Sequence, residues 1–224
     1  MACGANRIGK SVTGAYTTAL MVTGEHPTYK SPKEGIAWIV GLDSKALAAI
    51  CKPIFESYLP TRYMETGKWN GKHEYWTFKV DGREWQVWYK SVDAGRQKFQ
   101  GSQIDFAWVD EEPLKEGVFR EMELRMLDRE AIWLLTATPV EGTKWLSDTL
   151  ERDDVYWTMA GMRENPYIPL SEIDKISKQL APDERDVRIE GKYVIFGGRP
   201  VFDRDWLAEQ EVTASEYLQG TLVA

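Results

Sequence analysis

Cysteine and histidine are scarce in this sequence, which limits the chemistry that the chain can support. Cys3 and Cys51 do not make a disulfide framework, and with His26 and His73 they make no credible zinc set. The sequence also lacks the run of roughly 18 apolar residues that a membrane span requires. Its N-terminus does not show the basic-then-apolar order of a signal peptide. We therefore expect a soluble protein of a reducing, intracellular compartment.

Positive charge is also in short supply. The chain has 28 Lys and Arg against 35 Asp and Glu, which gives a formal net charge of -7. This balance argues against a broad basic face for nucleic acid, although a local groove remains compatible with it. Apolar residues are plentiful, at 43% of 224 residues with 10 Trp and 10 Tyr, which is ample for a packed core. The length predicts one large domain, or one domain with an appendage.

The order of apolar runs predicts an α/β fold with a mostly parallel central sheet flanked by helices. Short apolar runs are typical of strands that are buried on both faces of a parallel sheet. Helical patterns separate them, the second kinked at Pro53. The predicted strands are residues 35–42, 103–110, 131–139 and 155–159, and the predicted helices are residues 12–24, 44–58 and 114–127.

Two further features lie at the margins of this pattern. Residues 73–80 and 83–91 are rich in aromatic and β-branched residues and are joined by Asp81-Gly82, which predicts an antiparallel edge hairpin. Beyond Asn165 the sequence becomes polar and predicts two helices before an extended stretch at residues 193–202. We therefore divide the chain into a core, residues 1–163, and a small C-terminal helical appendage with a linker, residues 164–224.

A phosphate-binding motif begins at the fourth residue. The stretch GANRIGKS fits GxxxxGK[ST] at every fixed position, and in such a loop backbone N–H groups surround the phosphates. Lys10 is predicted to reach the β- and γ-phosphates, and the Ser11 hydroxyl to bind Mg²⁺. The alternative is a glycine-rich surface turn before a helix. The predicted nucleotide-binding residues of the loop are Gly4, Ala5, Asn6, Arg7, Ile8, Gly9, Lys10 and Ser11.

Carboxylates follow the predicted strand at residues 103–110. Asp110 and Glu111 come at its C-terminal end, where an open α/β sheet places its ligands. Asp110 is predicted to hold Mg²⁺ through water, and Glu111 to orient and deprotonate an attacking water molecule. Alternatively, the pair caps the next helix near Pro113.

Hydroxyl groups end the predicted strand at residues 131–139. Thr136 and Thr138 are predicted to sense the γ-phosphate from a strand beside that of Asp110. Alternatively, they cap the turn at Pro139.

An ATPase also needs positive charge against the transferring phosphoryl group, from its own chain or from a neighbouring subunit. Arg7 lies inside the phosphate loop and is the best internal candidate. Arg96, Arg125 and Arg129 are candidates to face a neighbouring subunit, and Arg96 ranks first. The predicted catalytic residues are therefore Glu111, Arg7 and Arg96.

The chain as a whole resembles the ATPase domain of the large terminase subunit of tailed bacteriophages. The resemblance rests on GANRIGKS with its arginine two positions before the GK, KFQGSQIDFAWVDEEP, LLTATPVEGTKWL, ENPYIP and RIEGKYVIFGGRPVF. It implies a P-loop NTPase of the ASCE type that uses ATP and Mg²⁺ to package double-stranded DNA into a procapsid. It also implies a homo-oligomeric ring on the portal protein, contact with the small terminase subunit, and the cytoplasm of the infected bacterium.

The same resemblance raises two expectations about the ends of the chain. Family members have a segment before the phosphate loop that completes the first strand and contacts adenine, and only Met1, Ala2 and Cys3 precede the loop here. They also carry a nuclease domain after the ATPase, and Asp203 and Asp205 are poor candidates for its metal site, so we expect no nuclease activity.

Other functions remain open at this point. The chain could bind nucleotide or serve as an assembly partner without turnover. A small-molecule kinase is a weaker alternative, since no acceptor pocket or arginine-rich lid is marked in the sequence. A helicase would need a second motor domain, for which the chain has no room.

Overall fold

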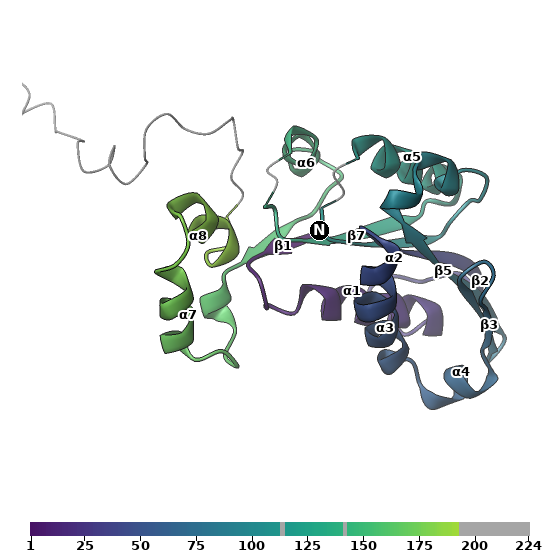
Figure 1. Cartoon of the computed structure of the whole chain (residues 1–224). Helices are drawn as coiled ribbons and strands as arrows, with labels where there is room; N and C mark the ends of the chain where they lie inside the picture. The colour runs from purple at the N-terminus through teal and green to yellow at the C-terminus, as the bar shows by residue number, and fades with distance from the viewer. Residues whose placement is uncertain (113–114, 141–142, 193–224) are drawn as a thin grey trace, which may run out of the picture.

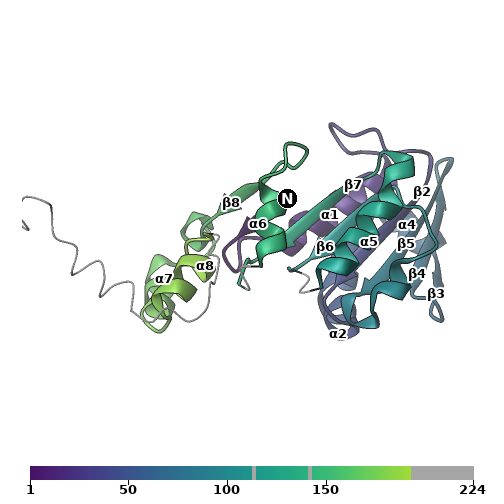
Figure 2. The same ribbon diagram turned by 90° about the horizontal axis from the view of Figure 1, so that it is seen from above.

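The computed structural model describes residues 1–112, 115–140 and 143–192. It contains a sheet of eight strands in the order β3-β4-β5-β2-β6-β7-β1-β8 (Figures 1 and 2). Neighbouring strands are parallel from β5 through to β8, and β3, β4 and β5 are joined antiparallel. This confirms the predicted α/β class. The strands are β1 (Ala2–Gly4), β2 (Glu34–Gly41), β3 (Lys68–Asn70), β4 (Tyr75–Val80), β5 (Arg83–Ser91), β6 (Phe106–Asp110), β7 (Ile132–Ala137) and β8 (Thr158–Ala160).

Helices cover both faces of this sheet, because its central strands are apolar on both sides. Figure 1 shows α1, α3 and α4 on one face, and α5 and α6 on the other. Each face has its own core, one around Trp108 and Trp85 and the other around Trp38 and Phe119. The helices are α1 (Lys10–Thr23), α2 (Ser44–Ala46), α3 (Lys52–Tyr58), α4 (Thr61–Thr66), α5 (Glu116–Met126), α6 (Lys144–Leu150), α7 (Leu170–Ser177) and α8 (Pro182–Arg188).

The helix predicted over residues 44–58 is interrupted. Asp43 caps α2, its side chain accepting hydrogen bonds from the N–H groups of Lys45 and Ala46. A π-helical turn, Leu47–Cys51, then leads into α3, where Pro53 lies in the first turn. Proline lacks an N–H and is tolerated in a first turn, so the predicted kink becomes a change of helix type.

The predicted hairpin is present between β4 and β5. Asp81 and Gly82 adopt left-handed angles, with φ of 54° and 71°, as a two-residue turn of type I′ requires. The hairpin is not the outermost element, because β3 pairs with β4 outside it. Neither β3 nor α4 was predicted from the sequence.

The short N-terminal stretch forms a strand despite its length. β1 lies between β7 and β8, with Ala2 in register with Thr136 on one side and Thr158 on the other. Cys3 on this strand is buried. The sheet thus delivers Gly4 to its C-terminal edge, where the phosphate loop begins.

A C-terminal lobe, residues 161–192, carries α7 and α8 and packs against the phosphate loop. Its small core joins Met162, Ile173 and Ile189 to Ala5 of the loop. The backbone N–H of Asn6 also donates to the Arg188 carbonyl at 3.1 Å. The predicted boundary between core and appendage, at residue 163, therefore lies in a region that packs against the phosphate loop. The extended stretch predicted at residues 193–202 lies outside the described residues.

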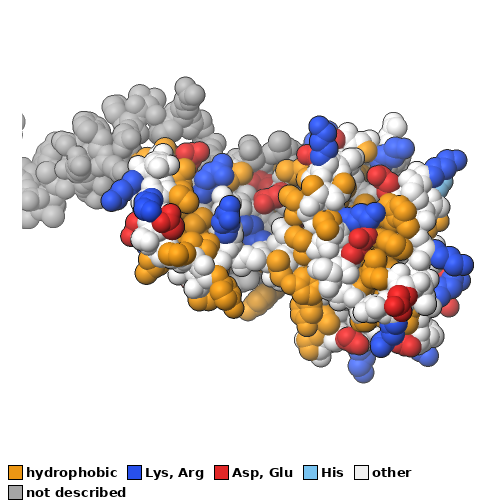
Figure 3. Space-filling view, turned by 60° about the horizontal axis from the view of Figure 1, so that its bottom comes forward, with side chains coloured by type: hydrophobic (Ala, Val, Ile, Leu, Met, Phe, Trp, Pro, Cys, Tyr) orange, Lys and Arg blue, Asp and Glu red, His pale blue; other side chains and the backbone are white. Residues whose placement is uncertain are grey.

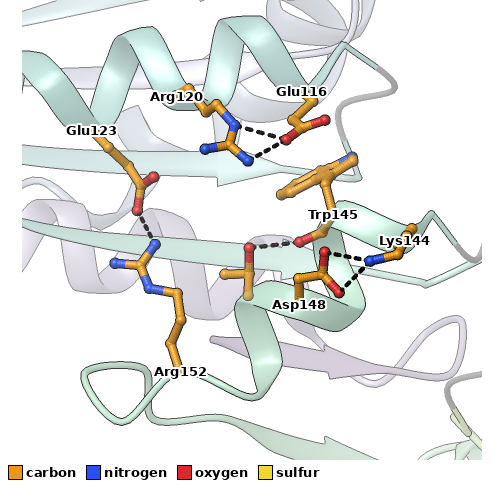
Figure 4. A network of polar contacts seen from close by, with 8 residues as sticks. Glu116, Arg120, Glu123, Lys144, Trp145, Asp148 and Arg152 are labelled. Atoms are coloured by element: carbon orange, nitrogen blue, oxygen red, sulfur yellow. Dashed lines mark hydrogen bonds and ion pairs between the residues drawn. The ribbon is translucent and has the colours of Figure 1, made fainter.

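Ion pairs cross the surface formed by α5 and α6 (Figure 4). Arg152, after α6, pairs with Glu123 of α5 at 2.6 Å, and Lys144 with Asp148 at 3.0 Å. Beside them a groove of about 530 Å³ is lined partly by Leu124. Exposed pairs contribute only about 0–1 kcal/mol each. The Arg152–Glu123 pair joins α5 to the segment after α6, whereas the Lys144–Asp148 pair lies within α6.

The surface shown in Figure 3 carries interspersed acidic and basic side chains, with hydrophobic ones among them. Tyr16 of α1 and Tyr58 of α3 are both exposed and their rings lie 5.4 Å apart. Over the described parts of the chain, none of the helices has the length and apolar character to cross a bilayer.

Candidate active site

The phosphate loop connects β1 to α1 at the C-terminal edge of the sheet. Gly9 precedes α1 with a left-handed φ of 89°, which favours glycine. Arg7 also takes a positive φ of 59°, which is uncommon for a non-glycine residue. These angles turn the chain sharply before Lys10, the first residue of α1. The motif therefore forms a loop before a helix N-terminus, the arrangement that binds phosphates.

Lys10 is held inside its own loop. Its Nζ donates to the Ala5 carbonyl at 2.6 Å, and the residue is 8% exposed. Burial lowers the pKa of the ammonium group, and the nearby carboxylates of Glu111 and Asp110 oppose that shift. Lys10 thus points into the loop, where the prediction places the phosphates.

Asp110 meets the loop from β6. Its carboxylate accepts hydrogen bonds from the Ser11 hydroxyl at 3.0 and 3.2 Å, across 99 residues of sequence. β7 separates β6 from β1 in the sheet, so both side chains reach over the end of β7. The two residues predicted to hold Mg²⁺ are therefore in direct contact.

Thr136 completes this contact at the end of β7. Its hydroxyl lies 2.8 Å from Asp110 Oδ1 and accepts a hydrogen bond from Trp108 Nε1 at 2.7 Å. The Cys51 thiol donates to the other carboxylate oxygen at 3.6 Å. Burial raises the pKa of Cys51 and Asp110 adds to that shift, so the thiol stays protonated. The sequence analysis named neither Trp108 nor Cys51.

The contact of Trp108 could have been predicted from the sequence, whereas the contact of Cys51 could not. Trp108 lies two residues before Asp110, so the period of a strand places both side chains on the same face. Cys51 reaches the site from a π-helical turn, and nothing in its sequence neighbourhood indicates that turn.

Glu111 follows Asp110 with a left-handed φ of 68°. Its N–H donates to the Thr136 carbonyl at 2.8 Å, and its Oε2 accepts from the Thr138 N–H at 3.1 Å. Burial raises the pKa of Glu111, against the opposing effects of that hydrogen bond and of Lys10. Because α5 begins only at Glu116 and Lys115 is its N-cap residue, neither carboxylate serves as its cap.

Thr138 contacts the phosphate loop itself. Its hydroxyl donates to Asn6 Oδ1 at 3.1 Å. Its own carbonyl accepts from the Val140 N–H at 2.7 Å, which forms the turn after β7. Thr138 is thus placed both to hold Glu111 and to contact the loop.

The predicted arginines are placed differently from one another. Arg7 is exposed in the loop, and its carbonyl accepts from Asn165 Nδ2 at 2.5 Å. Arg96 pairs with Glu121 of α5 at 2.9 Å instead of entering the site of its own chain. Arg125 shares Glu121, and Arg129 pairs with Asp105 at the opposite edge of the sheet, before β6.

The donor set around Ser11 and Asp110 fits Mg²⁺. It offers hydroxyl and carboxylate oxygens, and Mg²⁺ is commonly held by one or two carboxylates together with substrate phosphates and water. Across residues 1–112, 115–140 and 143–192, no cluster of three or more His, Cys, Asp or Glu side chains is arranged to hold a metal. A single carboxylate at a phosphate loop is the pattern expected for a metal that arrives with nucleotide.

Two hollows flank the loop and share Arg7 and Gly9. The first, about 390 Å³, is lined by phosphate-loop residues together with Glu111. The second, about 500 Å³, lies toward the C-terminal lobe and is lined partly by Asn165 and Tyr167. Asn165 also accepts from the Tyr167 N–H at 2.9 Å, which fixes the backbone at that tyrosine. The loop is therefore open on two sides.

A family model described as "Terminase large subunit, T4likevirus-type, N-terminal" matches residues 1–208. The chain belongs to this family. Among curated protein sequences, none matches it.

Solved structures agree with the fold of this terminase chain. The large terminase of a thermophilic bacteriophage aligns with a TM-score of 0.70 at 16% identity, over 91% of this chain and 51% of that one. The ATPase domain of the Thermus phage P74-26 large terminase aligns with a TM-score of 0.60 at 13% identity, covering 87% and 88%. The thermophilic bacteriophage protein has also been solved with ADP and with ATP-gamma-S. This chain spans about half the length of that protein.

Proposed function

We propose that this chain is an ATP-hydrolysing motor domain that uses Mg²⁺ and drives the packaging of double-stranded DNA. The observation that carries the proposal is the contact of Ser11, in the phosphate loop, with the Asp110 carboxylate at 3.0 and 3.2 Å. Lys10 and Glu111 flank that contact. A surface turn gives no reason for a strand carboxylate to lie against the hydroxyl of a phosphate loop.

In this proposal the residues of the loop bind and orient the phosphates. Backbone N–H groups of the loop and the N-terminus of α1 favour negative charge. Lys10 exchanges the Ala5 carbonyl for phosphate oxygens. Ser11 and Asp110 would hold Mg²⁺, which would neutralise charge on the phosphates.

Glu111 acts as the base in the same proposal. Its carboxylate accepts the proton of the attacking water molecule, and the Thr138 N–H fixes its orientation. A base is most effective when its pKa lies near the working pH, and burial raises the pKa of Glu111 in that direction. Because Thr138 also contacts Asn6, loss of the γ-phosphate can be communicated from Glu111 to the loop.

The nucleoside is assigned to the second hollow. Phosphates in the loop leave the ribose and base to extend past Arg7 and Gly9, and the hollow of about 500 Å³ lies directly beyond them. The ring of Tyr167 is 91% exposed there and offers a surface for stacking. This assignment places the base beside residues that follow β8, whereas the terminase resemblance implies a segment before the phosphate loop that contacts adenine.

The wider role that we propose is the one that the terminase resemblance implies. Packaging into a procapsid calls for a homo-oligomeric ring, a portal protein, a small terminase subunit and double-stranded DNA in the cytoplasm of the infected host. The surface shown in Figure 3 mixes acidic and basic side chains. We therefore propose that DNA is contacted by the assembled ring.

The test is Mg²⁺-dependent phosphate release by the purified chain over a range of protein concentration. Lys10→Ala and Glu111→Gln are expected to reduce release by at least about a hundredfold, because they remove phosphate stabilisation and the base. Glu74→Gln is a matched control: it alters an exposed glutamate that also has a positive φ, of 55°, and should leave release unchanged.

The outcomes separate the alternatives. Release that rises per subunit with concentration supports a motor that needs a neighbour. Nucleotide binding without release, at every concentration, supports an inert nucleotide-binding fragment or assembly partner. Phosphate transfer to an added small acceptor in preference to water supports a kinase and contradicts the proposal.

A further inference from the structure

Trp108 is a buried side chain on β6 that the proposed mechanism does not use. The residue is 0% exposed, and its indole Nε1 donates to Thr136 Oγ1 at 2.7 Å. Thr136 is fully buried as well. A buried indole N–H needs an acceptor, but an apolar core would have been served equally well by phenylalanine. The hydrogen bond therefore calls for an explanation beyond packing.

The direction of each hydrogen bond around Thr136 is fixed by the chemistry of its neighbours. Indole nitrogen is a donor only, so Thr136 Oγ1 must accept from Trp108. The single hydroxyl proton of Thr136 then goes to an acceptor, either Asp110 Oδ1 at 2.8 Å or the Val109 carbonyl at 3.3 Å. The shorter, charge-assisted bond is the stronger of the two. Because Thr136 Oγ1 accepts from the Trp108 N–H, its own hydroxyl proton points to Asp110.

Helix α1 is fitted to the same indole. A Cβ added at Gly14 would lie 2.0 Å from Trp108 Nε1, so this position requires glycine. Gly14 lies three residues after Ser11, on the same side of the helix. The indole therefore rests against the helix face that carries Ser11, while its N–H donates to Thr136 on the neighbouring strand β7.

We propose that Trp108 is a positioning residue for the carboxylate of Asp110, acting through Thr136, with α1 seated on its ring through Gly14. The consequence is a proposed metal site in which Ser11 and Asp110 are set relative to each other by one buried side chain. The inference rests on the proposed function, because it assigns Mg²⁺ to Ser11 and Asp110.

The experiment measures Mg²⁺ affinity directly, by calorimetric titration of Mg²⁺ into the chain saturated with ADP. Trp108→Phe keeps an aromatic ring and removes the N–H. It should weaken Mg²⁺ affinity roughly 2- to 10-fold, the net effect of one hydrogen bond. Affinity for ADP in EDTA should stay unchanged, because the loop that binds the phosphates is intact. A residue that only fills space would lower the melting temperature and leave the Mg²⁺ affinity alone.

Trp85→Phe is the matched control. Trp85 is also 0% exposed, its Nε1 donates to the Pro32 carbonyl at 3.1 Å, and its ring occupies the space where a Cβ of Gly35 would lie. It contacts none of the proposed metal ligands. Its truncation should lower the melting temperature by a similar amount without changing Mg²⁺ affinity.

A second set of variants tests the route through Thr136, and its two single variants keep the inference testable if Trp108→Phe does not fold. Thr136→Val should weaken Mg²⁺ affinity, Thr136→Ser should restore most of it, and Trp108→Phe combined with Thr136→Val should be no weaker than Thr136→Val alone. Mg²⁺ affinity that is unchanged in Thr136→Val, or lost equally in Trp85→Phe, overturns the inference. If the unaltered chain binds no Mg²⁺ with ADP, the proposed function fails with it. Normal Mg²⁺ binding in both the unaltered chain and Trp108→Phe refutes this inference alone.

Discussion

At the scale of single residues, two non-glycine residues of the candidate active site take a left-handed backbone conformation. Arg7 and Glu111 are non-glycine residues with φ of 59° and 68°, a conformation that costs on the order of 1–2 kcal/mol for each. Glu74, Asp81 and Glu130 take similar angles in turns, where strain is common. Glu111 instead follows a buried strand, and its N–H and carboxylate are both bonded to the end of β7. The hydrogen bonds that hold Glu111 in this strained conformation are therefore the same ones that place the proposed base.

The proposed base surface gives a prediction for Tyr167. Replacing it by alanine should weaken ADP binding about tenfold, since base–aromatic stacking contributes roughly 1–3 kcal/mol. Binding of inorganic tripolyphosphate, which has no base, should not change. Calorimetric titration of each ligand gives the comparison. Tyr156→Ala is the control, because Tyr156 is 90% exposed and does not line the hollow. Equal loss of tripolyphosphate binding would show that Tyr167 supports the loop instead of the base.

Sequence allows candidate site residues to be named where chemistry dictates the residue types. A phosphate loop needs glycine, lysine and serine at fixed positions, so Lys10 and Ser11 could be named from the motif. Their contact with Asp110 needs the order of strands, which no local pattern contains. Arg96 shows the limit: it was a candidate to face a neighbouring subunit, and the sequence did not indicate that its partner within the chain is Glu121. A side chain's partner across the fold is decided by packing.

At the scale of elements, prediction succeeded where one periodicity dominated. Strands β2, β6 and β7 are buried apolar runs, and α1 ends at Gly24 with φ 79°, as its sequence indicated. Prediction missed α4 and β3, because six and three residues carry too little periodic signal. It also missed α6, which follows a turn whose sequence resembles a loop. Short elements are specified by the surface they pack on.

The C-terminal lobe offers a prediction about how an element supports the loop. Ile173→Ala on α7 removes a fully buried side chain from the core that includes Ala5, at a cost of about 2–5 kcal/mol. In so small a core, we expect local opening rather than global unfolding. Hydrogen exchange should rise in residues 170–189 and also in the loop, at Asn6. Ile176→Ala on the same helix is the control, since Ile176 is 46% exposed.

The comparison between these two variants decides whether lobe and loop are one unit. Faster exchange in the lobe alone, with the loop protected as before, would mean that β1 and α1 hold the loop without help. Faster exchange in both the lobe and the loop would show that residues after 163 help to stabilise the phosphate loop.

At the scale of the whole molecule, the order of strands determines which residues meet at the candidate site. β7 lies between β6 and β1, so Asp110, Thr136 and the phosphate loop meet at one edge of the sheet. The sequence indicated that the strands were parallel and that those of Asp110 and Thr136 were neighbours. It did not indicate that β1 would form from three residues between β7 and β8. That placement depends on pairing with strands more than a hundred residues away.

Arg96 carries the last prediction, which concerns the assembled ring. It is exposed and its partner Glu121 is also bonded by Arg125, so Arg96→Ala leaves Glu121 paired and should fold. If Arg96 serves the site of a neighbouring subunit, Arg96→Ala and Glu111→Gln should each lack phosphate release. A mixture of the two variants should recover part of it, because an intact Arg96 can then meet an intact Glu111. Arg125→Ala, which removes the other partner of Glu121, should keep its activity. If the mixture is as inactive as each variant alone, Arg96 does not serve the site of a neighbouring subunit.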